Sequence, residues 1–108
     1  MKHNIIAVLY TTVNNNATGV SIAKRLLEKR LIVCANIFPK MTSMYLWNGE
    51  ISNDEEVAMI MKTTKHLIAE LTEELKAIHP YEIPCILEIE TSSVNEKYLE
   101  WAIRETSQ

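Results

Sequence analysis

The amino-acid sequence predicts an α+β fold, and three observations support that prediction. Apolar residues recur with a helical period in two segments, 17–30 and 65–78. Two short apolar runs, 5–10 and 85–91, are rich in the residues that strands favour. Between them, Asn48-Gly49 is the strongest short signal for a hairpin. With a last helix near the C-terminus, the order β-α-β-β-α-β predicts a ferredoxin-like sandwich, a sheet with helices on one face.

The length, composition and charge of the chain exclude several classes of protein. A length of 108 residues is typical of one domain, so residues 1–108 are expected to form a single unit with a small core. The composition is 47% hydrophobic and includes only two glycines, which excludes disordered and low-complexity classes. The net charge is −3, and no basic stripe of the kind that binds nucleic acid is present. The cluster Lys24, Arg25, Lys29 and Arg30 is mixed with Glu28 and is read as a solvated helix face.

The first two elements are a strand and a helix. Ile5–Tyr10 is continuous and apolar, which predicts a central strand buried on both faces. An asparagine run follows as a turn, and Asn16 or Thr18 is expected to cap the next helix. The helix over 17–30 is expected to bury one apolar face, made of Val20, Ala23, Leu26, Leu27 and Leu31.

The segment 32–62 predicts two long strands joined at Asn48-Gly49. Pro39 lies in the first of them and cannot donate to a ladder, so a kink or bulge is expected there. Strands this long project beyond a core one helix wide. The projecting tip carries Met44, Tyr45, Leu46 and Trp47, and a partner subunit is the natural cover for such a surface.

The second half repeats the pattern of helix and strand. The helix over 65–78 has an apolar stripe, and the run His79-Pro80-Tyr81-Glu82-Ile83-Pro84 ends it because two prolines remove backbone donors. Residues 85–91 predict a strand with apolar side chains inward and glutamates outward, and residues 96–105 predict a short terminal helix.

Several motifs occur in a fixed order along the chain: Cys34-Ala35-Asn36-Ile37-Phe38-Pro39, Ser43-Met44-Tyr45-Leu46-Trp47-Asn48-Gly49-Glu50-Ile51, Glu56, Lys62-Thr63, the His79–Pro84 run and Tyr98-Leu99-Glu100-Trp101. Together they resemble the CutA family of divalent-cation tolerance proteins. The resemblance covers nearly the whole chain. It implies a ferredoxin-like subunit in a tight homotrimer similar to the trimers of PII signalling proteins. It also implies tolerance of copper and other divalent ions, copper binding, and no attached enzymatic reaction.

Two positions depart from the family pattern. Cys85 follows Pro84 where the family usually has glutamate, and Tyr10 ends the first strand where some members carry cysteine. Both positions lie where a metal site has been proposed for the family. A thiol in place of a carboxylate shifts the preference from hard ions toward Cu(I) or zinc.

The predicted metal ligands are His79, Cys85 and Cys34, for copper or another divalent cation. Each has a structural alternative: His79 as the residue that ends a helix, and the two cysteines as small buried hydrophobes. Four methionines, at 41, 44, 59 and 61, are better explained by packing. The sequence has no Cys-x-x-Cys or His-x-x-x-His pair, which argues against a four-ligand zinc site.

A second candidate site is a cleft between subunits lined by Glu56, Lys62, Tyr81 and Trp101. Glu56 and Lys62 are six residues apart on one strand and therefore share a face. The alternative is that these polar groups form an ion-pair or hydrogen-bond network that holds the trimer together. Tyr45, Trp47 and Met44 at the hairpin tip are predicted to lie in the trimer interface.

Three functions remain open. The leading hypothesis is a non-catalytic homotrimer that binds divalent or copper ions, with no nucleic-acid or membrane partner. The others are a PII-like regulator that binds a small molecule in the intersubunit cleft, and a stable trimer that anchors an unknown protein partner. With only Gly19 and Gly49, the chain has no glycine-rich phosphate loop, which disfavours a nucleotide ligand. Two cysteines, no signal-peptide pattern and no apolar run long enough to span a membrane predict a cytoplasmic protein.

Overall fold

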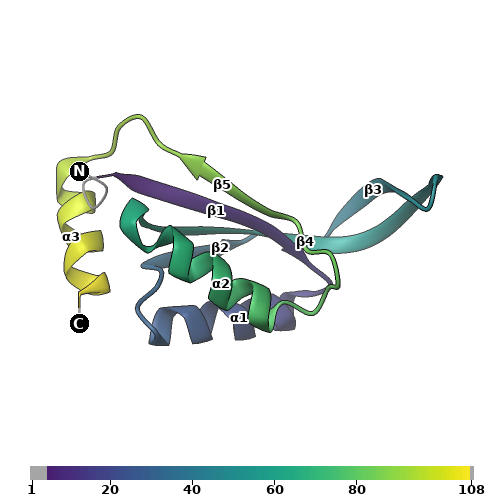
Figure 1. Cartoon of the computed structure of the whole chain (residues 1–108), viewed down its shortest axis with the longest axis horizontal. Helices are drawn as coiled ribbons and strands as arrows, with labels where there is room; N and C mark the ends of the chain where they lie inside the picture. Colours follow the sequence, from purple (N-terminus) through teal and green to yellow (C-terminus); the bar gives the residue numbers. More distant parts are fainter. Residues whose placement is uncertain (1–4, 108) are drawn as a thin grey trace.

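The computed structural model describes residues 5–107 (Figure 1). The elements in chain order are β1 (Ile6–Val13), α1 (Asn16–Glu28), β2 (Cys34–Ile37), β3 (Met41–Trp47), β4 (Glu50–Thr64), the 3-10 turn η2 (Lys65–Leu67), α2 (Ile68–Ile78), β5 (Ile86–Glu90) and α3 (Glu96–Thr106). The order of strands and helices is the predicted one. The predicted second strand is divided into β2 and β3.

The sheet is antiparallel, with the strand order β2-β4-β1-β5, and β3 pairs with the first half of β4. The expectation of a central first strand is confirmed, because β1 lies between β4 and β5. It runs on to Val13, three residues further than predicted, since Thr11, Thr12 and Val13 continue the ladder with β4.

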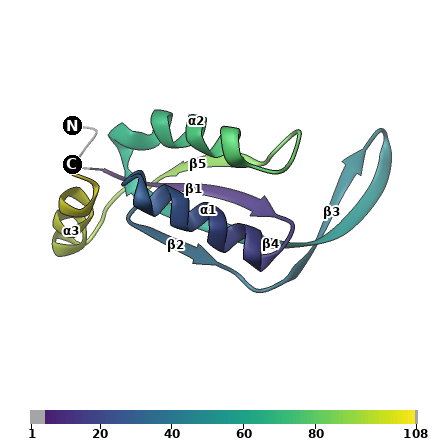
Figure 2. The same ribbon diagram turned by 90° about the horizontal axis from the view of Figure 1, so that it is seen from below.

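One face of the sheet is covered by α1 and α2. Alternate residues of β1 and β4, among them Leu9 and Met61, pack there against Leu26 of α1 and Leu71 of α2. These side chains are fully buried and form the main core. Figure 2 shows α1 and α2 side by side over this face, which we call the helix face.

The expectation that the two helices of the β-α-β-β-α-β unit share one face is confirmed for α1 and α2. The terminal helix α3, for which no face was predicted, lies on the other side of the sheet. Ala102 of α3 packs against Ile6 and Val33 in a second, separate cluster. Ile6 precedes Ala7 of the main core, and successive side chains of a strand point to opposite faces. The α3 helix therefore closes one end of the opposite face, which we call the back face.

Most of the back face is uncovered. Leu87 and Ile89 of β5 are 52% and 50% exposed. They pair with Tyr10 and Val8 of β1, and both of these are half-buried. The prediction of apolar side chains turned inward along this strand is therefore wrong for Leu87 and Ile89. Their face of the sheet lacks a covering layer within the part of the chain that the structure describes.

The hairpin of β3 and β4 extends away from the body at the end opposite α3 (Figure 2). Asn48 and Gly49 form its turn with φ of 52° and 80°, which confirms the turn prediction. Met44, Leu46 and Ile51 are each at least 70% exposed. The hairpin makes the molecule long, with extents of 45 × 26 × 24 Å.

The predicted irregularity at Pro39 is confirmed as a bulge. Ile37 pairs with Met59, but Met41 pairs with Glu56, so four steps on one strand match three on the other. The extra residue moves odd-numbered side chains of β3 onto the face that even-numbered ones occupy in β2. Ser43, Tyr45 and Trp47 consequently lie on the back face together with Glu56.

The ends of α1 differ in detail from expectation. The N-cap is Asn15, whose Oδ1 accepts from the Thr18 backbone N–H at 2.8 Å, rather than Asn16 or Thr18. Val20 and Leu27, expected to be buried, are 49% and 42% exposed, and Ile22 is buried instead. At the C-terminal end of α1, the backbone N–H of Arg30 donates to Leu27 O, and the N–H of Leu31 donates to Leu26 O. These two bonds, with Arg30 at φ 59°, form a Schellman motif.

The second helical segment begins as η2 and continues as α2, which confirms the predicted helix. Ile68, Leu71 and Leu75 are its buried positions. It ends at His79, whose backbone is extended and whose N–H still donates to Leu75 O. Pro80 follows and cannot extend the helix.

Candidate functional site

A cavity of about 870 Å³ opens on the back face where the hairpin leaves the body. The end of β1, both strands of the hairpin and the loop after α2 contribute to it. Its lining is Tyr10, Thr12, Asn14, Ser43, Tyr45, Trp47, Asp54, Glu55, Glu56, Pro80, Tyr81, Glu82, Ile83 and Cys85. Four of these described residues are carboxylates and none is Lys, Arg or His. We call this cavity the acidic pocket.

Phenol–carboxylate hydrogen bonds order the acidic pocket. The Tyr81 hydroxyl donates to Glu56 Oε2 at 2.6 Å, which joins the loop after α2 to β4. Burial, together with the Glu56 carboxylate, raises the pKa of Tyr81 far above its ordinary value. A second bond runs from the Tyr45 hydroxyl to Asp54 Oδ2 across the hairpin, and it raises the pKa of Tyr45. Both phenols stay protonated and donate, so the negative charge remains on the carboxylates.

Cys85 is the predicted ligand that the structure places in this pocket. It follows Pro84, is exposed, and forms no disulfide. Its thiol shares the cavity with the carboxylates of Asp54 and Glu56. The pocket therefore combines oxygen donors with one sulfur donor, a set to which several divalent ions bind.

His79 lies beside the pocket but is buried, with 8% of its surface exposed. Its Nδ1 accepts from the Tyr81 backbone N–H at 3.1 Å, so the ring proton is assigned to Nε2. Nε2 lies 3.0 Å from both Thr12 O and Thr11 Oγ1. Burial lowers the pKa of His79, partly opposed by the bond to Thr12 and by Glu56. The geometry matches the helix-ending alternative, and both ring nitrogens already have partners.

Cys34 lies elsewhere, on β2 near α3. Lys62 Nζ donates to Cys34 Sγ at 3.9 Å, and the thiol donates to Asn36 Oδ1 at the same distance. An ammonium group at this distance from the sulfur disfavours a metal cation there. Within residues 5–107, no three His, Cys, Asp or Glu side chains are close enough to hold one ion. His79, Cys85 and Cys34 therefore do not form one site within the chain.

The predicted cleft residues also divide into two groups. Glu56 and Tyr81 are bonded to each other in the acidic pocket. Trp101 packs with Tyr98 at a ring-centroid distance of 5.4 Å, in the α3 cluster that includes Cys34, the neighbour of Lys62. The interface candidates Tyr45, Trp47 and Met44 are exposed on the hairpin, as expected.

Sequence reasoning missed Asp54 as a pocket residue. A signal was available, because a two-residue turn at Asn48-Gly49 fixes the hairpin register and places Ser43 opposite Asp54. The bond from Tyr81 to Glu56 joins residues 25 positions apart, and no local pattern indicates it.

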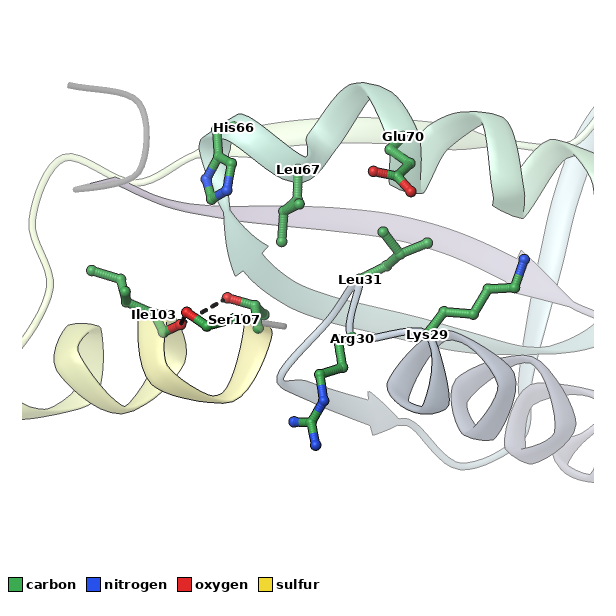
Figure 3. Close-up of a pocket in the computed structure, with 9 residues that line it drawn as sticks. Lys29, Arg30, Leu31, His66, Leu67, Glu70, Ile103 and Ser107 are labelled. Carbon is green, nitrogen blue, oxygen red and sulfur yellow. Dashed lines mark hydrogen bonds between the residues drawn. The ribbon is translucent and has the colours of Figure 1, made fainter.

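A second cavity of about 790 Å³ lies between the end of α1, η2 and the end of α3 (Figure 3). Its basic residues already have partners. Lys29 Nζ donates to Glu74 at 3.0 Å, and Arg30 donates to the backbone oxygen of Glu105 at 2.7 Å.

Comparisons with known proteins agree on one family. Residues 7–105 match the model described as CutA1 divalent ion tolerance protein. The chain is 42% identical to the divalent-cation tolerance protein CutA of Pyrococcus horikoshii over 99 residues, which cover 92% of this chain and 96% of that protein. It is 44% identical to the Thermotoga maritima protein of the same name over 94 residues, with coverages of 87% and 92%.

Solved structures give the same result. The divalent ion tolerance protein CutA1 of Ehrlichia chaffeensis superposes with a TM-score of 0.92 at 42% identity, covering 95% of this chain and 96% of that one. A protein of Archaeoglobus fulgidus, named the periplasmic divalent cation tolerance protein CutA, gives 0.91 at 37% identity, with coverages of 94% and 99%. The ferredoxin-like α+β prediction is confirmed by these matches. None of the helices over residues 5–107 is long and apolar enough to cross a bilayer.

Proposed function

The chain belongs to the CutA1 family of divalent ion tolerance proteins, and we propose that it acts as a non-catalytic homotrimer that binds divalent ions, copper among them. The relatives are named for tolerance of divalent cations and not for a reaction. The observation that carries the proposal is the acidic pocket, where the free Cys85 thiol and the Asp54 and Glu56 carboxylates line one cavity.

The donors of one chain do not complete a coordination shell. Within the described residues no three suitable side chains meet, so Cys85 with a carboxylate would supply part of the shell. Water or donors of a neighbouring subunit would supply the remainder, as is usual where carboxylates bind hydrated ions. His79 would support this site indirectly, because its ring accepts a hydrogen bond from the Tyr81 backbone N–H and the Tyr81 hydroxyl in turn orients Glu56.

Two exposed apolar surfaces support the homotrimer. One is the uncovered back face around Leu87 and Ile89, and the other is the hairpin with Met44, Leu46 and Trp47. Surfaces of this kind normally become buried between subunits. The acidic pocket lies between the two, so a partner seated on both would also border the pocket.

A competition titration tests the ion site. Reduced, metal-stripped protein is titrated anaerobically with Cu(I), and separately with Zn²⁺, against a chromogenic chelator. We expect saturable binding that weakens about tenfold or more in Cys85→Ser and in Glu56→Gln, since each removes a ligand worth over about 1.4 kcal/mol. Cys34→Ser is the matched control, because it removes the other free thiol and should leave binding unchanged.

Two results would contradict this assignment. Weak binding at many sites, equal in all variants, would mean adventitious ligation. Binding lost in His79→Ala, with the fold intact by circular dichroism, but kept in Cys85→Ser would move the ion to the imidazole.

A small-molecule regulator of the PII type is the second candidate. The volume of about 870 Å³ lies within the range of small-ligand pockets, and aromatic rings line part of the wall. A thermal-shift screen separates this candidate from the first, since a ligand at 100 times its Kd adds about 2.7 kcal/mol. A trimer that binds neither ion nor small molecule but retains a protein partner would support the anchoring function instead.

The proposed compartment is the cytoplasm, because both cysteines are free thiols. The Archaeoglobus fulgidus relative is named as periplasmic. Cell fractionation with an antibody against the chain would decide between the two compartments.

A further inference from the structure

The sheet has free edges on opposite sides, and β5 forms one of them. β5 pairs with β1 alone, and no strand of residues 5–107 pairs with its outer edge. The Thr91 N–H donates to Ile6 O, so the backbone groups of Thr91 face β1. Successive residues of an antiparallel strand direct these groups to alternate sides, so those of Ile86, Glu88 and Glu90 point outward. They are open donors and acceptors for another strand.

The hairpin strand β3 forms a free edge on the other side of the sheet. Within the described residues it pairs with β4 alone. A two-residue hairpin turn closes with a hydrogen-bonded pair, which here is Trp47 with Glu50. The same alternation therefore directs the backbone groups of Thr42, Met44 and Leu46 outward, away from β4.

The sequence of β3 makes an uncovered edge unfavourable. Its seven residues, 41–47, include no charged residue and no proline. Proteins normally protect an exposed edge with charges, proline or a covering segment, and residues 5–107 supply none of these along β3. An open segment of six or seven uncharged residues with high strand propensity is also a typical aggregation site. We therefore expect β3 to have a strand partner outside its own chain.

The two edges match each other on the back face. Tyr45 and Trp47 lie on that face of β3, and Leu87 and Ile89 lie on that face of β5. All four are at least 40% exposed. Side chains on the same face of two paired strands become direct neighbours, and pairs of aromatic and β-branched residues are favourable there. Pairing the edges of two copies would bring these side chains together and use the open backbone groups.

We propose that β3 of one subunit pairs edge to edge with β5 of the next, which joins the three sheets of the homotrimer into a closed ring. The inference rests on the proposed homotrimer and specifies how its subunits meet. A contact between two different surfaces uses one of each per copy, so it can close into a ring. A two-fold dimer that pairs β5 with β5 would leave β3 open. Cys85 directly precedes β5, so the neighbouring hairpin would also border the acidic pocket.

Matched pairs of variants test the strand pairing by sedimentation equilibrium. Met44→Pro removes an outward N–H, whereas Met44→Ala removes the same side chain and keeps the N–H. Glu88→Pro and Glu88→Ala make the same comparison on β5, and both lose the ion pair with Lys65. An edge strand tolerates proline where the nitrogen faces away from its own ladder. Each proline variant should dissociate at concentrations at least about tenfold higher than its alanine counterpart, since it loses a bond to the incoming strand and obstructs that strand.

A second measurement needs no variant. Isotope-labelled and unlabelled wild-type chains are refolded together, and NOEs between the two kinds of chain are recorded by NMR. We expect interchain NOEs between backbone protons of residues 42–46 and 86–90. A trimeric wild type without them would overturn this inference alone, and a monomeric wild type would overturn the homotrimer as well. Equal dissociation of the proline and alanine variants would assign the contact to side chains and would also overturn the strand pairing.

Discussion

His79 shows how one largely buried residue can join three segments of the chain. Its ring receives the Tyr81 N–H and donates toward the end of β1, so it fixes the loop on which Tyr81 and Cys85 lie. Tyr81 then holds Glu56. The imidazole must be neutral to accept at Nδ1, and this requirement makes the fold sensitive to acid.

We expect the free energy of unfolding to fall as the pH is lowered through about 6.5, the ordinary pKa of histidine. Because the pKa of folded His79 is depressed, the unfolded chain binds the proton first, and protonation favours unfolding. The stabilisation is fully present above about pH 7, and its slope cannot exceed about 1.4 kcal/mol per pH unit for one proton. Urea unfolding between pH 5 and 8 measures it.

His79→Gln should flatten that slope, and His66→Gln, an exposed position, should keep it. An unchanged slope in His79→Gln would assign the acid sensitivity to other groups.

Tyr81→Phe removes the hydroxyl that bonds Glu56. Since this bond is partly buried and involves a charge, we expect a loss of about 1–2 kcal/mol in urea unfolding. Tyr45→Phe removes a similar bond on the exposed hairpin and should leave the stability of the body unchanged. Equal losses in the two variants would contradict this view of the pocket.

At the level of elements, the hairpin and the helix positions differ in how well the sequence predicts them. Asn48-Gly49 imposes its turn locally, and Pro39 forces an irregularity wherever the strand lies, so both features were predictable. The buried face of α1 was predictable only in part, because its apolar residues extend around the helix and contacts in the assembled core decide that Ile22 is buried rather than Val20 and Leu27. The pairing of Tyr81 with Glu56 and of Cys34 with Lys62 arises only when the sheet is assembled.

The two glycines should respond oppositely to alanine. Gly49 has φ +80°, where a side chain is strained, so Gly49→Ala should cost about 1 kcal/mol of hairpin stability. A Cβ at Gly19 in α1 would meet its nearest neighbours at 3.5 Å, an ordinary contact. Gly19→Ala should therefore stabilise the protein by about 0.4–1 kcal/mol. Thermal unfolding of both variants provides the comparison, and a shared sign would refute it.

At the level of the whole molecule, the placement of α3 was the least predictable feature. Its sequence gives a helix with an apolar side, but nothing local states which face of the sheet it covers. Once α3 occupies one end of the back face, the remaining strip around Leu87 and Ile89 stays open. That strip, together with the exposed hairpin, supports the proposed homotrimer.

Ile89→Lys should dissociate the proposed trimer. It places a charge on the edge strand β5 of the uncovered face, and sedimentation should give a mass near the 12.4 kDa of one chain instead of about three times that value. Val20→Lys is the control, since Val20 is equally exposed but lies on the outer side of α1. A monomeric wild type, or dissociation by Val20→Lys alone, would exclude the back face as the interface.

The division of β4 has a consequence for backbone dynamics. Its second half, from Val57 onward, lies within the sheet of the body, whereas its first half is paired only with β3 in the exposed hairpin. In an isolated subunit, amide hydrogens of the first half should exchange with deuterium quickly, and those of the second half slowly. Association that covers the hairpin would slow exchange in the first half of β4 and so remove this difference in rate between the two halves. The amide exchange rate at each residue of β4 would therefore report whether the subunit is assembled. A mass measurement would give only an average over all species in the sample.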